Sequence, residues 1–201
     1  MSDEIIIGVD EVGRGCIAGD LLVCAYAIRL DATASEISEL KKVAMDSKSF
    51  SSRKKREAVL PIIENAGLFR YARRNPLQID ASNIRLATLD AMREAANGVR
   101  TLLKGAAGSR VIVDGRDVPQ GITSPVEALI KGDTKIVEIS CASVLAKVRR
   151  DIEMEEAGRL YPGYGFEKHA GYGTQEHRDA IGRQGLCDIH RSWAEKFSVQ
   201  P

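Results

Sequence analysis

The chain of 201 residues has few aromatic side chains, almost no net charge and no long hydrophobic run. The longest apolar runs, such as residues 21–28, fall far short of the ~18 to 20 residues that a transmembrane helix needs. Residues 1–4 lack the basic segment of a signal peptide, so we expect a cytoplasmic protein with no membrane segment. Lys and Arg total 29 against 28 for Asp and Glu, so bulk charge does not attract a polyanion. Any nucleic-acid interface must depend on a local patch.

The chain also lacks internal repeats, low-complexity tracts and Gly-, Ser- or Pro-rich linkers. Its few cysteines show no C-x-x-C spacing, which favours buried, reduced thiols over a zinc site or a disulfide framework: Cys16, Cys24, Cys141 and Cys187. With 44% hydrophobic residues, a chain of this length buries roughly 70% of the surface that its unfolded form exposes. These features exclude intrinsic disorder and predict one globular domain over residues 1–201.

Apolar runs separated by glycines predict an α/β domain. Residues 4–9 and 21–28, joined by the glycine-bearing segment 12–20, are typical of an antiparallel hairpin. Further strands are expected at residues 68–72, 110–113 and 128–131. Helices are expected from a cap at Ser51 or Ser52 to about Asn65, closed by Gly67, and over residues 81–103, 136–160 and 174–182, the last capped by Thr174. Residues 161–174 form a Gly- and Tyr-rich loop in this interpretation, and the whole pattern indicates a mixed sheet.

Acidic residues follow the strand-like runs, each with a glycine within two residues: Asp10, Glu11, Asp114 and Asp133. If these strand ends converge, four carboxylates meet in a small space and raise one another's pKa unless a cation neutralises them. Oxygen ligands without His or Cys favour Mg²⁺ or Mn²⁺, and two such ions can activate a water in phosphodiester hydrolysis. Any one of these acids alone is more typical of a solvated turn, but four in the same context favour a metal site.

A glycine loop follows the first two acids directly. Gly13 and Gly15 allow close backbone approach to a phosphate, and Arg14 would complete an anion site. The spacing Gly13-x-Gly15-x-x-Ala18 also matches a dinucleotide-binding fingerprint, but that motif must open a helix and a strand-like run follows here. A plain tight turn remains the simpler alternative.

Basic residues on the helix expected after Asp133 form a second candidate contact. Ser143 and Lys147 are spaced i, i+4 and share a face, with Arg150 one turn further on, and such a face can hold phosphates. A solvated helix face is the alternative. The basic cluster at residues 53–56 is interpreted as only solubilising a helix.

Tyrosines are concentrated near the C-terminus, in residues 161–166 and 171–174. Their rings can stack on sugars and bases, whereas packing against the core is an equal alternative for Tyr161 and Tyr164. The histidines lie in the same region and are interpreted as structural: His169, His177 and His190.

With these motifs assembled, the chain resembles ribonuclease HII, the type 2 ribonuclease H family, over nearly its whole length. The resemblance rests on these ordered motifs: GVDEVGRG (8–15), DSK (46–48), ID, NI and AT (79–80, 83–84 and 87–88), VDG (113–115), KGD (131–133), ASVLAKV and RD (142–148 and 150–151), YPGYGF (161–166), GYGT (171–174) and HRS (190–192).

The resemblance implies a ribonuclease H-like fold, with a mixed central sheet flanked by helices and a C-terminal loop and helices over about 160–201 that close the substrate groove. It implies cleavage of the RNA strand of RNA–DNA hybrids and of single ribonucleotides embedded in duplex DNA, leaving 3′-hydroxyl and 5′-phosphate ends. The family's metal ligands fall on Asp10, Glu11, Asp114 and Asp133. Its junction-reading residues fall on Gly13, Arg14, Gly15 and Tyr172, and its phosphate contacts include Ser143 and Lys147.

We interpret Asp10 as bridging two divalent ions, with Glu11 and Asp114 completing one shell and Asp133 the other. A ribonuclease HIII-like enzyme is the nearest alternative, but that family usually has an extra N-terminal domain, for which the strand beginning at Glu4 leaves no room. A non-catalytic nucleic-acid-binding module is the other, and it would be expected to have lost one of the acids.

The chain departs from the family pattern at three positions, where Cys16 and Asp20 replace a common proline and Trp193 replaces Phe. Asp20 adds an acid near the site and bears on the loop geometry there. We expect a monomer. The family often binds a sliding clamp through a short C-terminal tail, but residues 197–201 (FSVQP) show no clear clamp-binding motif.

Overall fold

A five-stranded mixed sheet forms the centre of the computed structural model, which describes residues 4–45, 50, 52–104 and 108–198. Its strands are β1 (Ile5–Val12), β2 (Leu21–Ile28), β3 (Gly67–Arg74), β4 (Ser109–Asp114) and β5 (Val126–Leu129), in the order β3-β2-β1-β4-β5. Antiparallel pairing joins β1 to β2 and β2 to β3, whereas β1, β4 and β5 pair in parallel. The predicted hairpin and mixed sheet are therefore confirmed. The DSK motif at 46–48, Ser51 and tail residues 199–201 lie outside the described residues.

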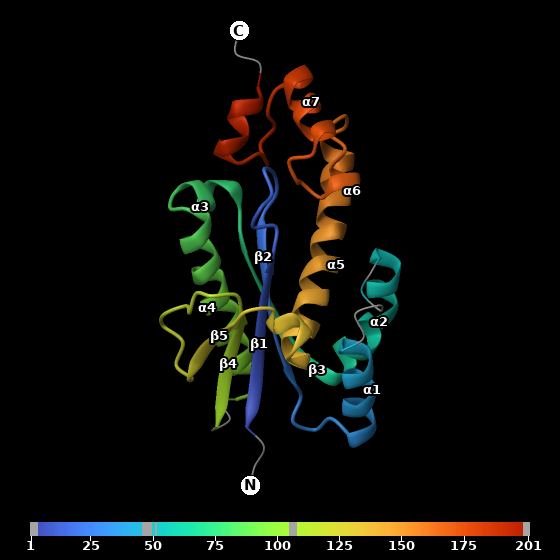
Figure 1. Cartoon of the computed structure of the whole chain (residues 1–201), viewed down its shortest axis with the longest axis vertical. Helices are drawn as coiled ribbons and strands as arrows, with labels where there is room; N and C mark the ends of the chain where they lie inside the picture. Colours follow the sequence, from blue (N-terminus) through green and yellow to red (C-terminus); the bar gives the residue numbers. More distant parts are fainter. Residues whose placement is uncertain (1–3, 46–49, 51, 105–107, 199–201) are drawn as a thin grey trace.

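Helices cover both faces of this sheet (Figure 1). They are α1 (Ala34–Ala44), α2 (Arg53–Ala66), α3 (Pro76–Asp80), α4 (Ile84–Leu102), α5 (Val137–Leu160), α6 (Phe166–His169) and α7 (Gln175–Gln184), with short 3-10 turns η2 (Gly132–Thr134) and η3 (Ser192–Phe197). Helix α4 packs on one face, and α5 with α1 and α2 packs on the other (Figure 1). No helix in the described part of the chain is long and apolar enough to cross a membrane.

Capping side chains set several helix starts. Ser52 and Thr174 accept hydrogen bonds from backbone N–H groups of α2 and α7, as predicted. The helix predicted from Ala81 begins instead at Ile84, because Asn83 Oδ1 accepts from Leu86 N at 2.9 Å.

Other boundaries were predicted wrongly or not at all. β5 begins and ends two residues earlier than the predicted strand 128–131, and α6 interrupts the predicted loop 161–174. Helices α1 and α3 were not predicted, although Thr33 and Glu36 form a capping box that marks the start of α1.

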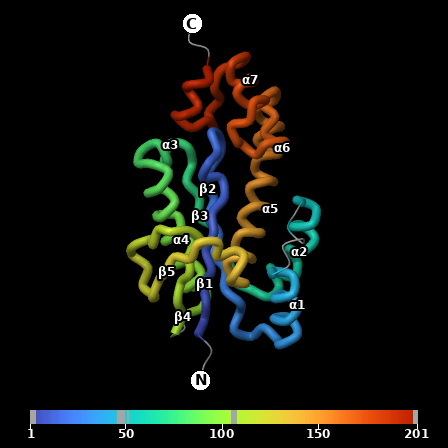
Figure 2. The backbone as a smooth tube through the Cα atoms, viewed as in Figure 1, coloured from blue at the N-terminus to red at the C-terminus, as the bar shows by residue number. Residues whose placement is uncertain are grey.

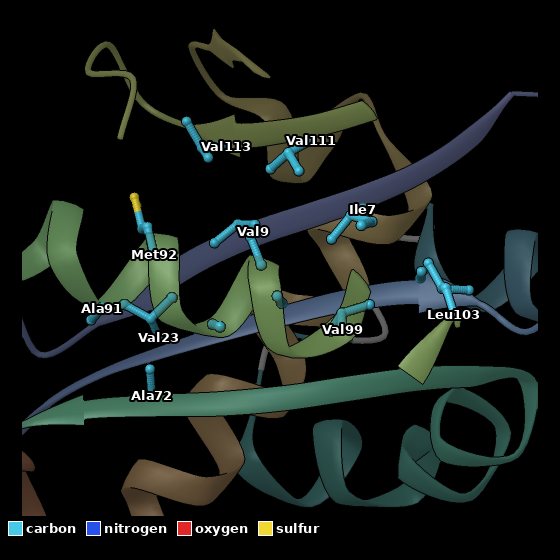
Figure 3. Close-up of a cluster of buried hydrophobic side chains, with 14 residues drawn as sticks. Ile7, Val9, Val23, Ala72, Ala91, Met92, Val99, Leu103, Val111 and Val113 are labelled. Atoms are coloured by element: carbon cyan, nitrogen blue, oxygen red, sulfur yellow. The ribbon is translucent and has the colours of Figure 1, made fainter. Parts of the chain in front are cut away.

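Alternation along the strands divides the core into two layers. Val9, Val23 and Val113 point to the α4 face, where they meet Met92 and Val99 (Figure 3). The residues between them point to α5, so Cys24 and Tyr26 pack against Cys141, Leu145 and their neighbours.

Close contact between β1 and α5 brings the helix to the strand end. A Cβ atom at Gly8 would lie 2.3 Å from the Glu138 carbonyl carbon, so only glycine permits this approach.

The basic cluster at residues 53–56 does more than solubilise α2. Arg53 pairs with Glu155 at 2.6 Å, and Arg56 pairs with Asp151 at 2.8 Å, which ties α2 to α5.

Residues 161–198 pack beyond the end of the sheet, around Phe166 (Figure 2). Ala18 and His190 form an isolated β-bridge that joins this part to the segment between β1 and β2. All four cysteines are free, as predicted, and three of them are buried.

Candidate active site

Asp10 and Glu11 lie within β1 near its end, not after it as predicted. Because successive strand residues point to opposite faces, Asp10 is directed to the α5 side and Glu11 away from it. Asp10 is only 5% exposed, and its backbone is the Cα partner of Cys24 on β2. The strand thus carries an acid into the interior rather than into a solvated turn.

Asp114 and Asp133 come to the same region from neighbouring elements. Val9 pairs with Val113 in the parallel β1–β4 ladder, so the next residues, Asp10 and Asp114, are neighbours across the sheet. Asp114 is the last residue of β4, and its Oδ1 accepts from Gly132 N at 2.7 Å. That bond fixes η2, which contains Asp133, against the end of β4.

Burial is the main reason why the pKa values of Asp10 and Glu11 are raised at this strand end. It raises the pKa of Asp10 to about 7, and the charges of Glu11 and Asp114 add to the effect. A hydrogen bond from Ser143 and the charge of Lys147 act in the opposite direction. Burial and Asp114 also raise the pKa of Glu11, which Arg14 partly offsets.

The structure brings three of the four predicted acids into mutual interaction. Asp10 interacts with both Glu11 and Asp114, and Glu11 with Asp114. Asp133 lines a cavity of about 390 Å³ together with Ser143 and Lys147, the two residues of α5 that also act on Asp10.

The carboxylates of this group already have other partners. In the part of the chain that the structure describes, no three His, Cys, Asp or Glu side chains are arranged to hold a metal ion. Asp10 Oδ1 accepts from Glu11 N at 2.8 Å, and Glu11 Oε1 lies 3.7 Å from Arg14 Nη1.

Helix α5 contributes Ser143 and Lys147 but not Arg150. Lys147 Nζ donates to Ser143 Oγ at 2.7 Å, and both residues face the cavity beside Asp133. The prediction that Arg150 joins this face is wrong, since its side chain is 2% exposed.

Two buried arginines instead hold the segment that follows the acids, and sequence reasoning missed this role. Arg150 donates to the carbonyl oxygens of Asp20, Ala18 and Ala170. Arg191 donates to the carbonyl of Gly19 at 2.9 Å and to that of Cys16 at 3.0 Å. Burial and the charge of Arg150 lower the pKa of Arg191 to about 10. Helical spacing alone gave no signal of these contacts, because every acceptor is a distant backbone carbonyl.

The loop of Gly13, Arg14 and Gly15 lies between Arg150 and Tyr172. Gly13 has a φ of +85°, and a Cβ there would lie 2.7 Å from Arg150 Cζ, so this position requires glycine. A Cβ at Gly15 would lie 3.9 Å from Tyr172 Cε1, which places the two residues side by side. The side chain of Arg14 is 45% exposed and Tyr172 is 48% exposed. The predicted junction-reading residues therefore lie together, with Arg14, Gly15 and Tyr172 exposed and Gly13 buried.

The other tyrosines near the C-terminus belong to the core. Tyr164 is buried, stacks on Phe166 with ring centroids 5.2 Å apart, and donates to the Gly185 carbonyl. Tyr161 is partly buried against the same cluster. For these two residues the packing alternative is correct.

The three departures from the family pattern are accommodated by local contacts. Cys16 Sγ donates to the Ala170 carbonyl at 3.5 Å, and burial raises the pKa of the Asp20 carboxyl while the charges of Arg73 and Arg150 offset this. The Arg191 guanidinium lies over the Trp193 ring, 5.4 Å from its centroid.

Comparison with known proteins places this geometry in a family. The family model described as Ribonuclease HII matches residues 7–197. The ribonuclease HII of Francisella tularensis subsp. mediasiatica is 40% identical over 187 residues, which cover 93% of this chain and 93% of that protein.

Two solved structures share the fold. Ribonuclease HII from Archaeoglobus fulgidus, solved in a complex with PCNA, superimposes with a TM-score of 0.76 at 24% identity, covering 98% of each chain. Bst-RNase HIII in complex with Mn²⁺ gives 0.69 at 16% identity, covering 96% of this chain but 64% of that one. The sequence relationship is thus to ribonuclease HII, and the HIII alternative is not supported. This chain belongs to the ribonuclease HII family and is a type 2 ribonuclease H, a nuclease of the hydrolase class.

Proposed function

We propose that the enzyme hydrolyses the RNA strand of RNA–DNA hybrids and cuts on the 5′ side of single ribonucleotides embedded in duplex DNA, leaving 3′-hydroxyl and 5′-phosphate ends. The observation that carries the proposal is the buried Asp10 among Glu11 and Asp114, directly followed by the glycine loop that faces Tyr172. The proposed catalytic acids and the proposed sugar-binding surface of the glycine loop and Tyr172 are thus only a few residues apart in the chain at the glycine loop.

The acidic group fits a pair of divalent cations, Mg²⁺ or Mn²⁺. Its donors are carboxylate oxygens, which are the ligands that hard divalent cations prefer. The positive charge of Lys147 also acts on Asp10 and lowers its pKa. Asp10, Glu11 and Asp114 would hold one ion, and Asp10 with Asp133 the other. When bound, such ions supply an activated water and stabilise the leaving oxygen of a phosphodiester.

The remaining residues bind and orient the substrate in this proposal. Lys147, held by Ser143, offers positive charge in the cavity beside Asp133, where a phosphate would lie. Arg14 and the backbone N–H groups of Gly13 and Gly15 contact the sugar and phosphate of the ribonucleotide. Tyr172 stacks on the following deoxyribose, where a 2′-hydroxyl would crowd its ring.

We also propose that residues of about 160–201 close one end of the substrate groove within a single domain over 1–201, and that the enzyme acts as a monomer. The Archaeoglobus fulgidus relative was solved in a complex with PCNA, which makes PCNA a candidate partner for this chain.

The decisive experiment is cleavage of duplex DNA with one embedded ribonucleotide in the presence of Mg²⁺, Mn²⁺ or chelator. We expect a single cut on the 5′ side of the ribonucleotide with either ion and none with chelator. An all-DNA duplex is the control. Cutting that persists with chelator, or that ignores the ribonucleotide, contradicts the proposal.

A further inference from the structure

Three buried histidines next to the Tyr172 loop have no part in the chemistry proposed above. His169 ends α6, His177 lies in the first turn of α7, and His190 follows α7. All three are at most 8% exposed, and the rings of His169 and His177 stack with centroids 4.4 Å apart. Hydrogen bonds link His190 to His177 and His177 to the Tyr172 carbonyl, while the His169 ring bonds separately to Gly171 N and the Tyr164 carbonyl.

The direction of these hydrogen bonds is determined by the backbone groups at both ends. Cys187 N donates to His190 Nδ1 at 2.9 Å, so that nitrogen is unprotonated and the proton of His190 is on Nε2. His190 Nε2 lies 3.1 Å from His177 Nε2 and donates to it. The proton of His177 is then on Nδ1, which donates to the Tyr172 carbonyl at 2.9 Å.

The reverse direction is excluded at the Tyr172 end. Nδ1 of His190 also lies 3.2 Å from the Cys187 carbonyl, to which it could donate. His177 Nε2 would then have to carry the proton, and its unprotonated Nδ1 would face the Tyr172 carbonyl, which can only accept. Burial lowers the pKa of both His177 and His190, which favours neutral rings, and each neutral ring then has one defined tautomer.

His169 fixes the other side of the same loop. Its Nδ1 accepts from Gly171 N at 3.3 Å, while its Nε2 donates to the Tyr164 carbonyl at 2.9 Å. Gly171 O accepts from Ile17 N at 2.9 Å, which ties the loop to the segment after Gly15. The backbone of Tyr172 is thus held from both sides although its ring is half exposed.

We propose that His177 and His190 are positioning residues that place the Tyr172 ring beside Gly15 and thereby set the selectivity for an RNA-to-DNA junction. This inference rests on the proposed function of Tyr172. Neither histidine touches substrate, and their effect passes through the Tyr172 carbonyl. That carbonyl also accepts from Thr174 N at 2.8 Å, so the same atom joins the loop to the start of α7.

The test uses the different reach of two amide side chains. The amide nitrogen of Asn lies near the position of His Nδ1, and that of Gln near the position of Nε2. His177→Asn therefore keeps a donor for the Tyr172 carbonyl, whereas His177→Gln loses it. Both variants remove the ring and its packing, so a purely structural role would affect them alike.

The measurement is the ratio of cleavage rates on the embedded ribonucleotide and on uniform RNA–DNA hybrid, at 25 °C with melting curves to confirm folding. We expect His177→Gln to lower this ratio roughly 2- to 10-fold, the value of one hydrogen bond. His177→Asn should keep it near the unaltered protein, and the rate on uniform hybrid should change little in both.

A second pair of variants keeps the test decisive if His177 tolerates no change. The bond from His190 to His177 starts at Nε2, so at this position His190→Gln should retain selectivity better than His190→Asn. This reversal of preference between the two sites does not follow from loss of stability alone.

Tyr172→Ala separates failure of this inference from failure of the proposed function. If Tyr172→Ala leaves the ratio unchanged, Tyr172 does not read the junction, and both its proposed role and the positioning role of the histidines are overturned. If it lowers the ratio while the Asn and Gln variants behave alike at each histidine, the positioning role alone is overturned. Different effects in the expected order support it.

Discussion

Two groups of buried titratable side chains meet the loop at residues 13–20, and burial acts on them in opposite directions. Asp10 is 5% exposed and its pKa is raised to about 7, while His177 is fully buried and its pKa is lowered to about 4. In each case the apolar surroundings disfavour the charged form. The groups differ in their partners, since like charges surround Asp10 whereas neutral hydrogen-bond partners satisfy both nitrogens of His177.

The acidic group around Asp10 therefore has the properties of a cation-binding site, whereas the histidine group has those of a structural network. A buried acid beside other acids lowers the stability of the empty protein and gains when a cation arrives. A fully satisfied buried network rigidifies its surroundings without requiring any ligand. The loop with Gly13 and Gly15 lies between the acidic group and the histidine group, so one short segment of chain connects them.

The largest effect should come from the acidic group. Asp10→Asn is expected to reduce hydrolysis roughly 10³-fold or more, because it removes a proposed metal ligand and with it several kcal/mol of stabilisation from the transition state. Duplex binding, which depends mainly on phosphate contacts, should remain nearly intact. Cleavage assays and filter binding measure the two.

The same variant should melt at a higher temperature than the unaltered protein when chelator is present. The substitution removes a buried carboxylate from its repulsion by Glu11 and Asp114. Asp20→Asn is the matched control, since Asp20 is also partly buried but is not a proposed ligand. Full activity of Asp10→Asn in chelator contradicts the metal assignment.

Removing Arg150 should loosen the segment of residues 13–20, which connects the acidic group to the histidine group. Arg150→Met leaves the carbonyls of Ala18, Asp20 and Ala170 without this donor, and we expect a loss of about 3 kcal/mol in the free energy of unfolding, measured in urea. The adjacent Arg149→Met is the control. Arg149 pairs with Glu153 at the surface, and its loss should cost less than about 1 kcal/mol. Equal effects would show that Arg150 does not hold the loop.

Acid should affect the histidine group before it affects the rest of the fold. Burial lowers the pKa of His177 from 6.5 to about 4, and the His169 and His190 rings add to this. A depressed pKa means that the stabilisation is complete above pH 6.5 and is lost as the pH falls toward 4. At about 1.4 kcal/mol per unit, the free energy of unfolding should fall by about 3 kcal/mol over this range.

Urea titrations at a series of pH values measure this slope. His177→Asn has no titrating group at the position and should show a flatter profile between pH 6.5 and 4. A slope unchanged in that variant would assign the acid sensitivity to other residues.

A smaller effect on activity than that of Asp10→Asn should come from Tyr172. Tyr172→Ala is expected to weaken binding at a single embedded ribonucleotide about 5- to 150-fold, because stacking on a sugar or base contributes roughly 1 to 3 kcal/mol. The loss on uniform hybrid should be smaller, and metal binding should be unchanged. Equal losses on both substrates would assign Tyr172 to general packing or catalysis.

Local patterns in the sequence were sufficient for several elements and for the site candidates. Ser52, Thr174 and the apolar runs of β1 and β2 are signals within a few residues, and the structure has the expected caps and hairpin there. α1 was missed although its Thr33–Glu36 capping box is equally local. The acids were recognised through their position near strand ends, even though Asp10 proved to lie within a strand.

The roles of the buried polar residues could not be read in this way. Helical spacing placed Arg150 with Ser143 and Lys147, whereas its partners are carbonyls from residues 18, 20 and 170. Tyr161, Tyr164 and Tyr172 have similar glycine-rich surroundings in the sequence, yet only Tyr172 is substantially exposed beside the glycine loop. These differences arise from which segments meet in space.

By itself, the sequence determined the α/β class, the mixed sheet, the reduced cysteines and which residues could form a site, because these follow from periodicity, capping and residue chemistry within short windows. The tertiary structure decided which of those residues share an environment. It buried Asp10 with Glu11 and Asp114, turned Arg150 and Arg191 onto backbone carbonyls, and assigned one tautomer each to His177 and His190. Burial and hydrogen-bond partners depend on contacts between residues far apart in the chain, and no local pattern encodes them.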